Sequence, residues 1–351
     1  MGPGSNVMAF SHAPAATAQP GVIARWLLAV AALVIAIVVI GGITRLTESG
    51  LSIVEWKVVS GTLPPIGSAQ WQAAFDAYRQ TPQFTQVNGP QGMTLADFKF
   101  IFLWEWAHRL LGRVIGLAMA LPMAWFWLRG KLPPGYAPRL LALLALIGLQ
   151  GTFGWLMVRS GLSGRTMVEP HWLATHLLTA LFTLGGLVWT ALDLLALTRG
   201  EPRSRLPGLA ALALAMLAVQ LLYGALMAGM RAGVIASDWP LMQGALVPAG
   251  IDWSQGPGTA LLGDPYLVHF IHRWWAWAVV VVLIILGRAL RRSGQRAPSL
   301  VLHSTFGLQI VLGIATVMSG VALWLAVLHQ LVGALLVGAT AWSAHALGRK
   351  Q

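Results

Sequence analysis

Four histidines of this chain lie within about two helical turns of the expected outer ends of long apolar segments, where a polar side chain is costly to insert. Neutral imidazole is a good ligand for haem iron, and a flat macrocycle between two helices needs one nitrogen from each side. The pattern therefore predicts two bis-histidine haem sites, with His108 and His176 in one and His272 and His329 in the other. Hydrogen-bonded core histidines are the alternative, and zinc is disfavoured because no third ligand accompanies either pair.

A small residue follows each of these histidines by four positions, which is the same face of a helix. Such a residue would let a porphyrin plane lie close to the backbone. The four small residues are Gly112, Ala180, Ala276 and Gly333. Four further histidines lie in the tail, on another helix face or at inner ends of segments, and are predicted not to bind iron: His12, His171, His303 and His345.

An acidic residue distinguishes the first histidine pair from the second. Glu105 lies three residues before His108 on the same face, whereas the equivalent position of the second pair holds His269. A carboxyl group there could move protons next to a bound substrate, or could be a structural partner of Arg109 or of the histidine. Four arginines near the outer boundary are candidates either for contacts with anionic haem propionates or for snorkelling to water and headgroups: Arg45, Arg109, Arg231 and Arg273.

Eight apolar segments must position these side chains. Of the 351 residues 57% are hydrophobic and 10% charged, and the mean hydropathy is +0.70. Runs of about 20 apolar residues cross a hydrocarbon core of about 30 Å, and in lipid they must be helices because the backbone has no water to bond. The expected segments are 24–44, 103–127, 139–158, 172–196, 207–229, 268–290, 300–320 and 325–346. The predicted fold class is an all-α polytopic membrane protein.

The formal charge of +12 indicates membrane topology and not a nucleic-acid site. Arginine and lysine gather in alternate loops, as at 129–139, 199–205 and 288–296. By the positive-inside rule both termini are predicted to be cytoplasmic in the inner (plasma) membrane, with the haem sites near the outer, periplasmic face. The first segment is too long for a cleavable signal peptide and lacks a small-residue cleavage site. The chain has no cysteine, which excludes disulfides, thiolate metal sites and cysteine nucleophiles.

The two halves of the sequence resemble each other. "GLQGTFGWLMVRSG" (148–161) aligns with "GLQIVLGIATVMSG" (307–320), and Gly41, Gly50, Glu55 and Trp56 match Gly224, Gly233, Asp238 and Trp239 at a constant offset of 183. The repeat predicts two pseudo-symmetric four-helix bundles related by an axis along the membrane normal. The expected organisation is a tail, 1–23, whose opening resembles a cloning remnant; a first bundle, 24–196; a cytoplasmic linker, 197–206; a second bundle, 207–346; and a tail, 347–351.

Several stretches together resemble the haem A synthase family of the alphaproteobacterial and mitochondrial type. They are "GGITRLTESGLS" (41–52), "DFKFIFLWEWAHRLLGR" (97–113), "QGTFGWLMVRSGL" (150–162), "GALMAGMRAG" (224–233), "DWPLM" (238–242), "IHR" (271–273) and "HQ" (329–330). The resemblance implies oxidation of the C8 methyl group of haem O to the formyl group of haem A. It implies that His108 and His176 hold the substrate haem, that His272 and His329 ligate a haem b cofactor, and that Glu105 is the essential acid.

Other classes of function are also compatible with four histidines. A dihaem b-type electron-transfer cytochrome linked to quinol is the main alternative, and a haem carrier is another, since tandem repeats are common in transporters. Glu105, which has no acidic counterpart in the second half, favours the enzyme. The expected partners are the lipid bilayer, an electron-transfer partner, haem O synthase and other copies of the chain in a homo-oligomer, with no nucleic acid.

Overall fold

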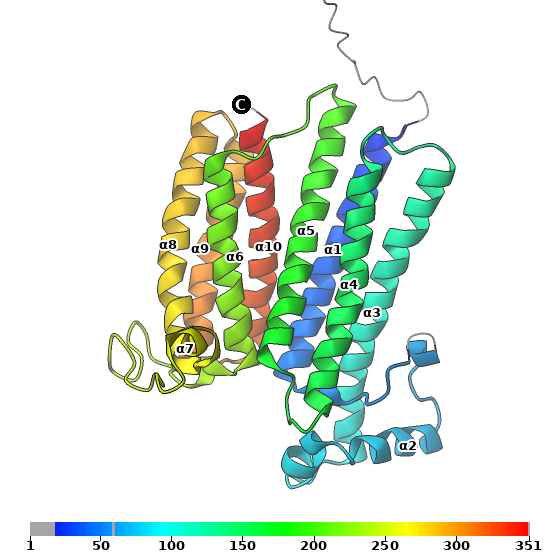
Figure 1. Cartoon of the computed structure of the whole chain (residues 1–351), viewed down its shortest axis with the longest axis vertical. Coiled ribbons are helices and arrows are strands. Elements are labelled where there is room, and N and C mark those ends of the chain that lie inside the picture. Colours follow the sequence, from blue (N-terminus) through cyan, green and yellow to red (C-terminus); the bar gives the residue numbers. More distant parts are fainter. Residues whose placement is uncertain (1–17, 58–59, 350–351) are drawn as a thin grey trace, which may run out of the picture.

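Eight long helices make up the body of the computed structural model, which describes residues 18–57 and 60–349 (Figure 1). Each is long and apolar enough to cross a membrane, so the eight expected segments are confirmed. They are α1 (Pro20–Leu46), α3 (Leu95–Leu128), α4 (Ala137–Leu162), α5 (Pro170–Thr198), α6 (Gly208–Gly229), α8 (Pro265–Arg292), α9 (Arg296–Met318) and α10 (Leu323–Gly348). Two short helices, α2 (Ser68–Tyr78) and α7 (Pro257–Gly263), lie in the outer loops. The tail-remnant interpretation and His12 lie outside the described residues.

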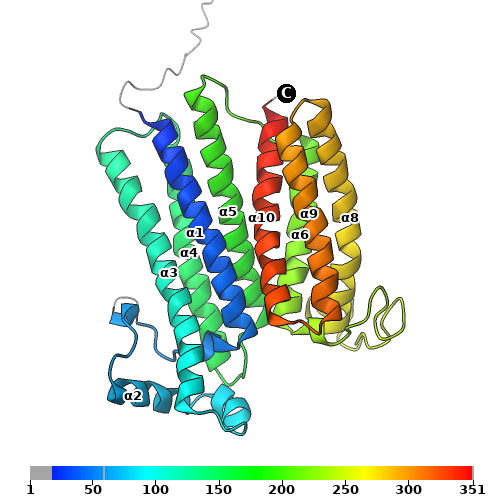
Figure 2. The ribbon, with the colours of Figure 1, turned by 180° about the vertical axis from the view of Figure 1, so that it is seen from behind.

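The long helices form two groups of four that lie side by side (Figures 1 and 2). The first group is α1, α3, α4 and α5, and the second is α6, α8, α9 and α10. Three contacts join the groups: α5 with α6, α1 with α10, and α5 with α10. The start of α1 and the end of α10 lie at one end of the molecule, whereas α2 and α7 lie at the other (Figure 1). We call the end with α2 and α7 the outer end.

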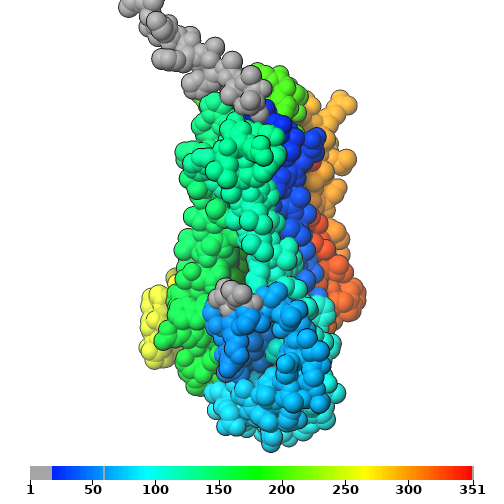
Figure 3. Space-filling view, turned by 90° about the vertical axis from the view of Figure 1, so that its right-hand side faces the viewer, coloured from blue at the N-terminus to red at the C-terminus, as the bar shows by residue number. Residues whose placement is uncertain are grey.

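Helix α3 is longer at its outer end than the sequence predicted. It begins at Leu95 and not near 103, because Thr94 and Asp97 form a capping box. Its 34 residues correspond to about 51 Å at a rise of 1.5 Å per residue, well beyond a ~30 Å hydrocarbon core. The extra turns carry an aromatic cluster that includes Phe75 and Tyr78 of α2. This lobe is visible at the foot of Figure 3. His108 therefore lies 13 residues from the outer end of its helix, and not within the two turns that the sequence predicted.

The sequence repeat extends to the backbone at the outer ends of α1 and α6. The two helices end at Leu46 and Gly229, which differ by the offset of 183. Each end is followed by a residue with positive φ, Glu48 at 56° and Arg231 at 55°, and then by one turn of 3-10 helix. These two equivalent residues form an ion pair with each other. Nη2 of Arg45 also donates to the carbonyl of Ala228, its own equivalent, at 2.6 Å.

A buried acid joins the two halves at the inner end. Asp193 of α5 is 1% exposed, and its carboxylate lies 2.5 Å from Nη1 of Arg139 and 2.9 Å from Nε2 of His345 on α10. The backbone N–H of Ser204, in the linker between the halves, donates to the same carboxylate at 3.1 Å. Because a buried carboxylate needs partners for all its charge, this cluster holds α4, α5, α10 and the linker together.

Candidate functional site

The structure brings the four predicted iron ligands together as the two predicted pairs. The ring centroids of His108 and His176 are 6.4 Å apart with an interplanar angle of 79°. Those of His272 and His329 are 6.5 Å apart at 84°. A metal–imidazole bond is about 2.0–2.1 Å long, and the ring centroid lies about 1.1 Å beyond the bonded nitrogen. Two imidazoles on opposite sides of one metal therefore have centroids about 6.3 Å apart. Both pairs therefore fit bis-imidazole binding of one iron.

Each of the four rings packs against a glycine of the neighbouring helix. A Cβ atom on any of these glycines would lie at about the closest approach that real Cβ contacts tolerate. The pairs are Gly41–His108, Gly154–His176, Gly224–His272 and Gly313–His329, with Cβ-to-ring distances of 3.1, 3.2, 2.9 and 3.0 Å. Sequence reasoning found these glycines only as repeat identities and did not assign them this role. The signal was available, because glycine recurs at both pairs of equivalent positions.

The two glycines among the small residues four positions after a histidine lie next to other side chains. A Cβ at Gly112 would lie 3.6 Å from Cδ1 of Ile37, and one at Gly333 would lie 3.3 Å from Nε2 of Gln309. They therefore allow close approach of neighbouring helices in this structure. Their expected place beside a macrocycle stays a prediction.

Three glutamines reach the iron-ligand candidates from adjacent helices. Nε2 of Gln220 lies 3.1 Å from Nδ1 and 3.0 Å from the carbonyl oxygen of His272. Nε2 of Gln309 lies 3.4 Å from Nε2 of His329. Nε2 of Gln150 donates to the backbone carbonyl of His176 at 3.0 Å. None of the three was singled out from the sequence, although Gln150 and Gln309 are repeat equivalents.

The carboxylate of Glu105 is buried and fully engaged. The residue is 2% exposed. Oε2 accepts from the hydroxyl of Ser52 and from the backbone N–H of Ile53, both at 2.7 Å, and Oε1 accepts from Nη2 of Arg109 at 2.6 Å. The acid therefore anchors the segment after α1 to α3, one helical turn from His108. A fixed carboxylate at this place can act on a neighbouring ligand through its charge.

Arg109 and Arg273 fasten equivalent outer loops. Nη2 of Arg109 donates to the carbonyl of Ile53, and Nη1 to that of Glu55. Arg273, 5% exposed, donates in the same way to the carbonyls of residues 236, 238 and 241. Its Nε donates to Nε2 of His269 at 2.9 Å. His269 thus fills, in the second half, the acceptor role that Glu105 has for Arg109. All four arginines predicted to contact propionates have partners within the chain.

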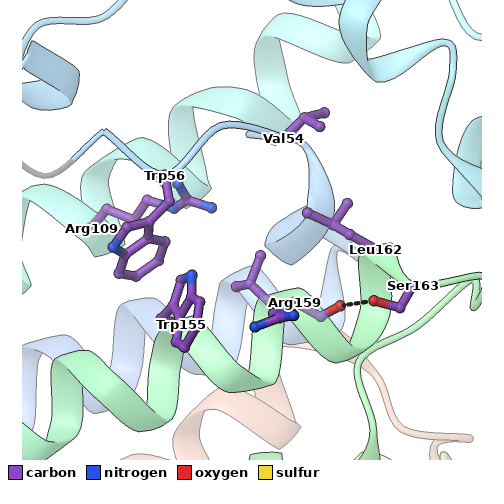
Figure 4. A pocket seen from close by; sticks show the side chains of 8 residues that line it. Val54, Trp56, Arg109, Trp155, Arg159, Leu162 and Ser163 are labelled. Carbon is purple, nitrogen blue, oxygen red and sulfur yellow. Dashed lines mark hydrogen bonds between the residues drawn. The ribbon is translucent and has the colours of Figure 1, made fainter.

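A pocket of about 160 Å³ opens between the segment after α1 and the outer end of α4, and Arg109 of α3, the residue after His108, also lines it (Figure 4). Its lining includes Trp56, Arg109, Trp155 and Arg159. The guanidinium carbon of Arg109 lies 5.0 Å from the ring of Trp56, and that of Arg159 lies 5.3 Å from the ring of Trp155. The lining is therefore cationic and aromatic. The sequence did not single out Arg159, whose repeat equivalent in α9 is a methionine.

Three of the other histidines, His171, His303 and His345, have structural partners, and the prediction that they do not bind iron stays a prediction. Nδ1 of His171 lies 2.5 Å from Oε1 of Glu169, which caps α5. Nδ1 of His303 lies 2.7 Å from the carbonyl oxygen of Ser299. His345 belongs to the Asp193 cluster. Within residues 18–57 and 60–349, no group of three or more acidic or histidine side chains could hold a metal ion.

The sequence of this chain is similar to those of known proteins. The family model described as "Cytochrome oxidase assembly protein" (COX15-CtaA) matches residues 24–341. A protein of Novosphingobium aromaticivorans named "Heme A synthase" is 64% identical over 351 residues, which cover 98% of this chain and 100% of the relative. Proteins of the same name from Sphingopyxis alaskensis and Erythrobacter litoralis are 54% and 57% identical, over 99% and 93% of this chain and 98% and 97% of their own lengths.

Proposed function

The chain belongs to the cytochrome oxidase assembly protein family, and on that premise we propose that it is a haem A synthase, an oxidoreductase that converts haem O to haem A. The reaction oxidises the C8 methyl group of the porphyrin to a formyl group, and the product serves terminal oxidases. One observation carries the proposal. Two histidine pairs share a geometry that fits iron, and only one of them has a buried carboxylate one turn away.

The first bundle holds the substrate in this proposal. His108 and His176 bind the iron of haem O and thereby fix the porphyrin between α3 and α5. Glu105 supplies a carboxylate held in place by three donors, one of which is the guanidinium of Arg109 in an ion pair. Such a preorganised charge stabilises positive character at the carbon being oxidised, and the same carboxylate can accept a proton from it.

The second bundle holds haem b, bound by His272 and His329. Haem b supplies one-electron transfer when bound, with a potential set by its axial ligands and their hydrogen bonds. His269 accepts a hydrogen bond from Arg273 at the place where the first bundle has an acid. A neutral residue there suits a site that transfers electrons and does no proton chemistry on a methyl group.

The haem propionates are bound at the outer rim of both sites in this proposal. Arg45, Arg109, Arg231 and Arg273 supply positive charge there, and their contacts with loop carbonyls and with Glu48 fix where that charge stands. In the first bundle the pocket lined by Arg109 and Arg159 adds a cationic, aromatic surface. Anionic carboxylates favour such surroundings, because charge-assisted hydrogen bonds to guanidinium are strong.

The protein works as a multi-pass membrane protein. We place it in the inner membrane with both termini in the cytoplasm and both haem sites toward the periplasm, on the loop charges. Its partners in this proposal are haem O synthase as the source of substrate, an electron-transfer protein or quinone, and other copies of the chain.

Pigment extraction tests the proposal. The protein, purified from cells that make haem O, should yield haem b together with haem O or haem A by chromatography. His272→Ala and His329→Ala should lower the haem b content, whereas His108→Ala and His176→Ala should abolish haem A and leave haem b largely intact. Haem b alone, at two per chain, would favour the dihaem electron-transfer cytochrome, which the matched geometry of the two pairs also fits. Unchanged pigments in all four variants would reject the ligand assignment.

A further inference from the structure

The two histidine pairs differ in what touches their rings. In the second bundle a glutamine amide approaches each ring: Gln220 lies 3.1 Å from Nδ1 of His272, and Gln309 lies 3.4 Å from Nε2 of His329. In the first bundle Gln150 bonds only to the backbone carbonyl of His176. Within the described part of the chain, the ring of His108 has no hydrogen bond. The repeat therefore preserved the glycines and histidines and changed the polar contacts.

The difference is sharpest between α6 and α1. The position equivalent to Gln220, at the offset of 183, is Ile37. Ile37 is partly buried, packs against the apolar core and offers no donor or acceptor near His108. Gln220 contacts both the ring and the backbone carbonyl of His272. One substitution between equivalent helices thus decides whether the ligand histidine of the next helix has a polar partner.

A ligand histidine that binds iron through one nitrogen needs a partner for the other nitrogen, because that partner fixes the tautomer and the ring orientation. Oε1 of Gln220 is buried and has no hydrogen-bond partner among the described residues. The atom that contacts the ring is the donor Nε2, and the same amide carries Oε1, which accepts from the N–H of an iron-bound ring once the amide turns over. The contact with Gln220 favours one orientation of the His272 ring, whereas the His108 ring packs against Gly41 with no hydrogen bond among the described residues.

We propose that Gln220 is a positioning residue that retains the resident haem through His272, and that Ile37 at the equivalent place leaves His108 as the exchangeable ligand of the substrate haem. The inference rests on the proposed function. In that function, two sites of the same geometry hold haems with different residence times. A cofactor must stay through many turnovers, whereas a substrate iron must gain and lose a ligand in every turnover.

The test uses the full-length protein purified in detergent. Haem release is measured as transfer of haem b to excess apomyoglobin, followed by absorbance, and the midpoint potential of the bound haem b is measured by redox titration. Gln220→Leu should release haem b about 10–100-fold faster, the usual cost of losing a partner of a metal ligand, and should raise the potential. Gln220→Glu, which keeps an acceptor, should restore retention and lower the potential because it increases the basicity of the ring.

Two further variants serve as controls. Gln150→Leu removes an amide that does not touch a ring, so it should leave haem b release and potential unchanged. Ile37→Gln gives the first bundle the missing amide, and the purified protein should then retain more haem O and haem A relative to haem b. A potential unchanged in both Gln220 variants would overturn the inference. That result would leave the proposed function intact as long as haem A is still made, whereas absence of haem A and haem O from the wild-type protein would count against the function itself.

Discussion

Replacing Glu105 by glutamine removes one charge and keeps one acceptor oxygen in a buried side chain that accepts three hydrogen bonds. In the wild-type protein Oε2 accepts from Ser52 and Ile53, and Oε1 accepts from Arg109. A glutamine can keep its oxygen toward Ser52 and Ile53 and turn its NH₂ group toward Arg109. Arg109 then loses one bond and keeps its contacts with the loop carbonyls.

The cost to stability follows from this arrangement. Hydrogen bonds to charged groups contribute about 1.5–3 kcal/mol each, so the loss of one leaves a protein with a typical stability of about 5–15 kcal/mol folded. Haem b content should therefore be unchanged. If the charge acts on the oxidised carbon, the rate of haem A formation should fall about 10²–10³-fold, the usual effect of removing one preorganised electrostatic group.

Ser52→Ala is the matched control. It removes a 2.7 Å hydrogen bond from the same carboxylate oxygen and keeps the charge. It should cost about 1 kcal/mol of stability and leave haem A formation close to that of the wild type. The assay is chromatography of extracted haems over time, with haem b as the folding control.

Two results would refute the reasoning. Near wild-type haem A from Glu105→Gln would show that the carboxylate serves only to anchor the loop. Equal loss of haem A in Glu105→Gln and Ser52→Ala would show that loop position matters and that charge does not.

One further change tests the packing beside a histidine, and another tests the buried cluster at the inner end. Gly313→Ala would place Cβ 3.0 Å from the ring of His329, and overpacking of about 1–3 kcal/mol should lower haem b content and shift its low-spin spectrum. Gly307→Ala in the same helix is the control, because its new Cβ has no atom within 4 Å, and it should leave content and spectrum unchanged. Equal spectra in the two variants would contradict the glycine contact. Asp193→Asn removes a buried charge that has three partners, and it should lower the free energy of unfolding by about 3–5 kcal/mol, measured by thermal unfolding in detergent. Asp76→Asn on the exposed face of α2 is the control and should change that free energy by less than about 0.5 kcal/mol. Similar unfolding temperatures for both variants would show that the inner cluster contributes little.

Hydropathy and residue spacing predicted the eight helices and both histidine pairs, because the cost of burying polar groups in lipid leaves few arrangements open. The rings of His108 and His176, and those of His272 and His329, lie next to each other as the sequence predicted, and their binding of iron stays a prediction. The outer turns of α3 were missed, because they contain Asp97 and Lys99 and are not apolar. Water-exposed helix continues from a membrane segment wherever a good cap allows it.

Contacts between helices could not be predicted in the same way. The rule that residues four apart share a face operates within one helix, so it pointed to Gly112 and Gly333 and not to Gly41 and Gly313 on the neighbouring helices. Position 269 holds a histidine where the first half has Glu105. The structure adds that the fold needs an acceptor, which a neutral histidine supplies in the second half.

The ion pair between Glu48 and Arg231 has a meaning for the ancestry of the chain. If a duplicated half-protein once assembled as a dimer of identical copies, each residue at the twofold contact met its own duplicate. A glutamate there would have faced a glutamate, and an arginine an arginine. Opposite charges at equivalent positions can arise only after two copies are free to diverge. This ion pair therefore favours an assembly of two different halves over an assembly of two identical halves. Fusion into a single chain guarantees that the two halves occur in a one-to-one ratio.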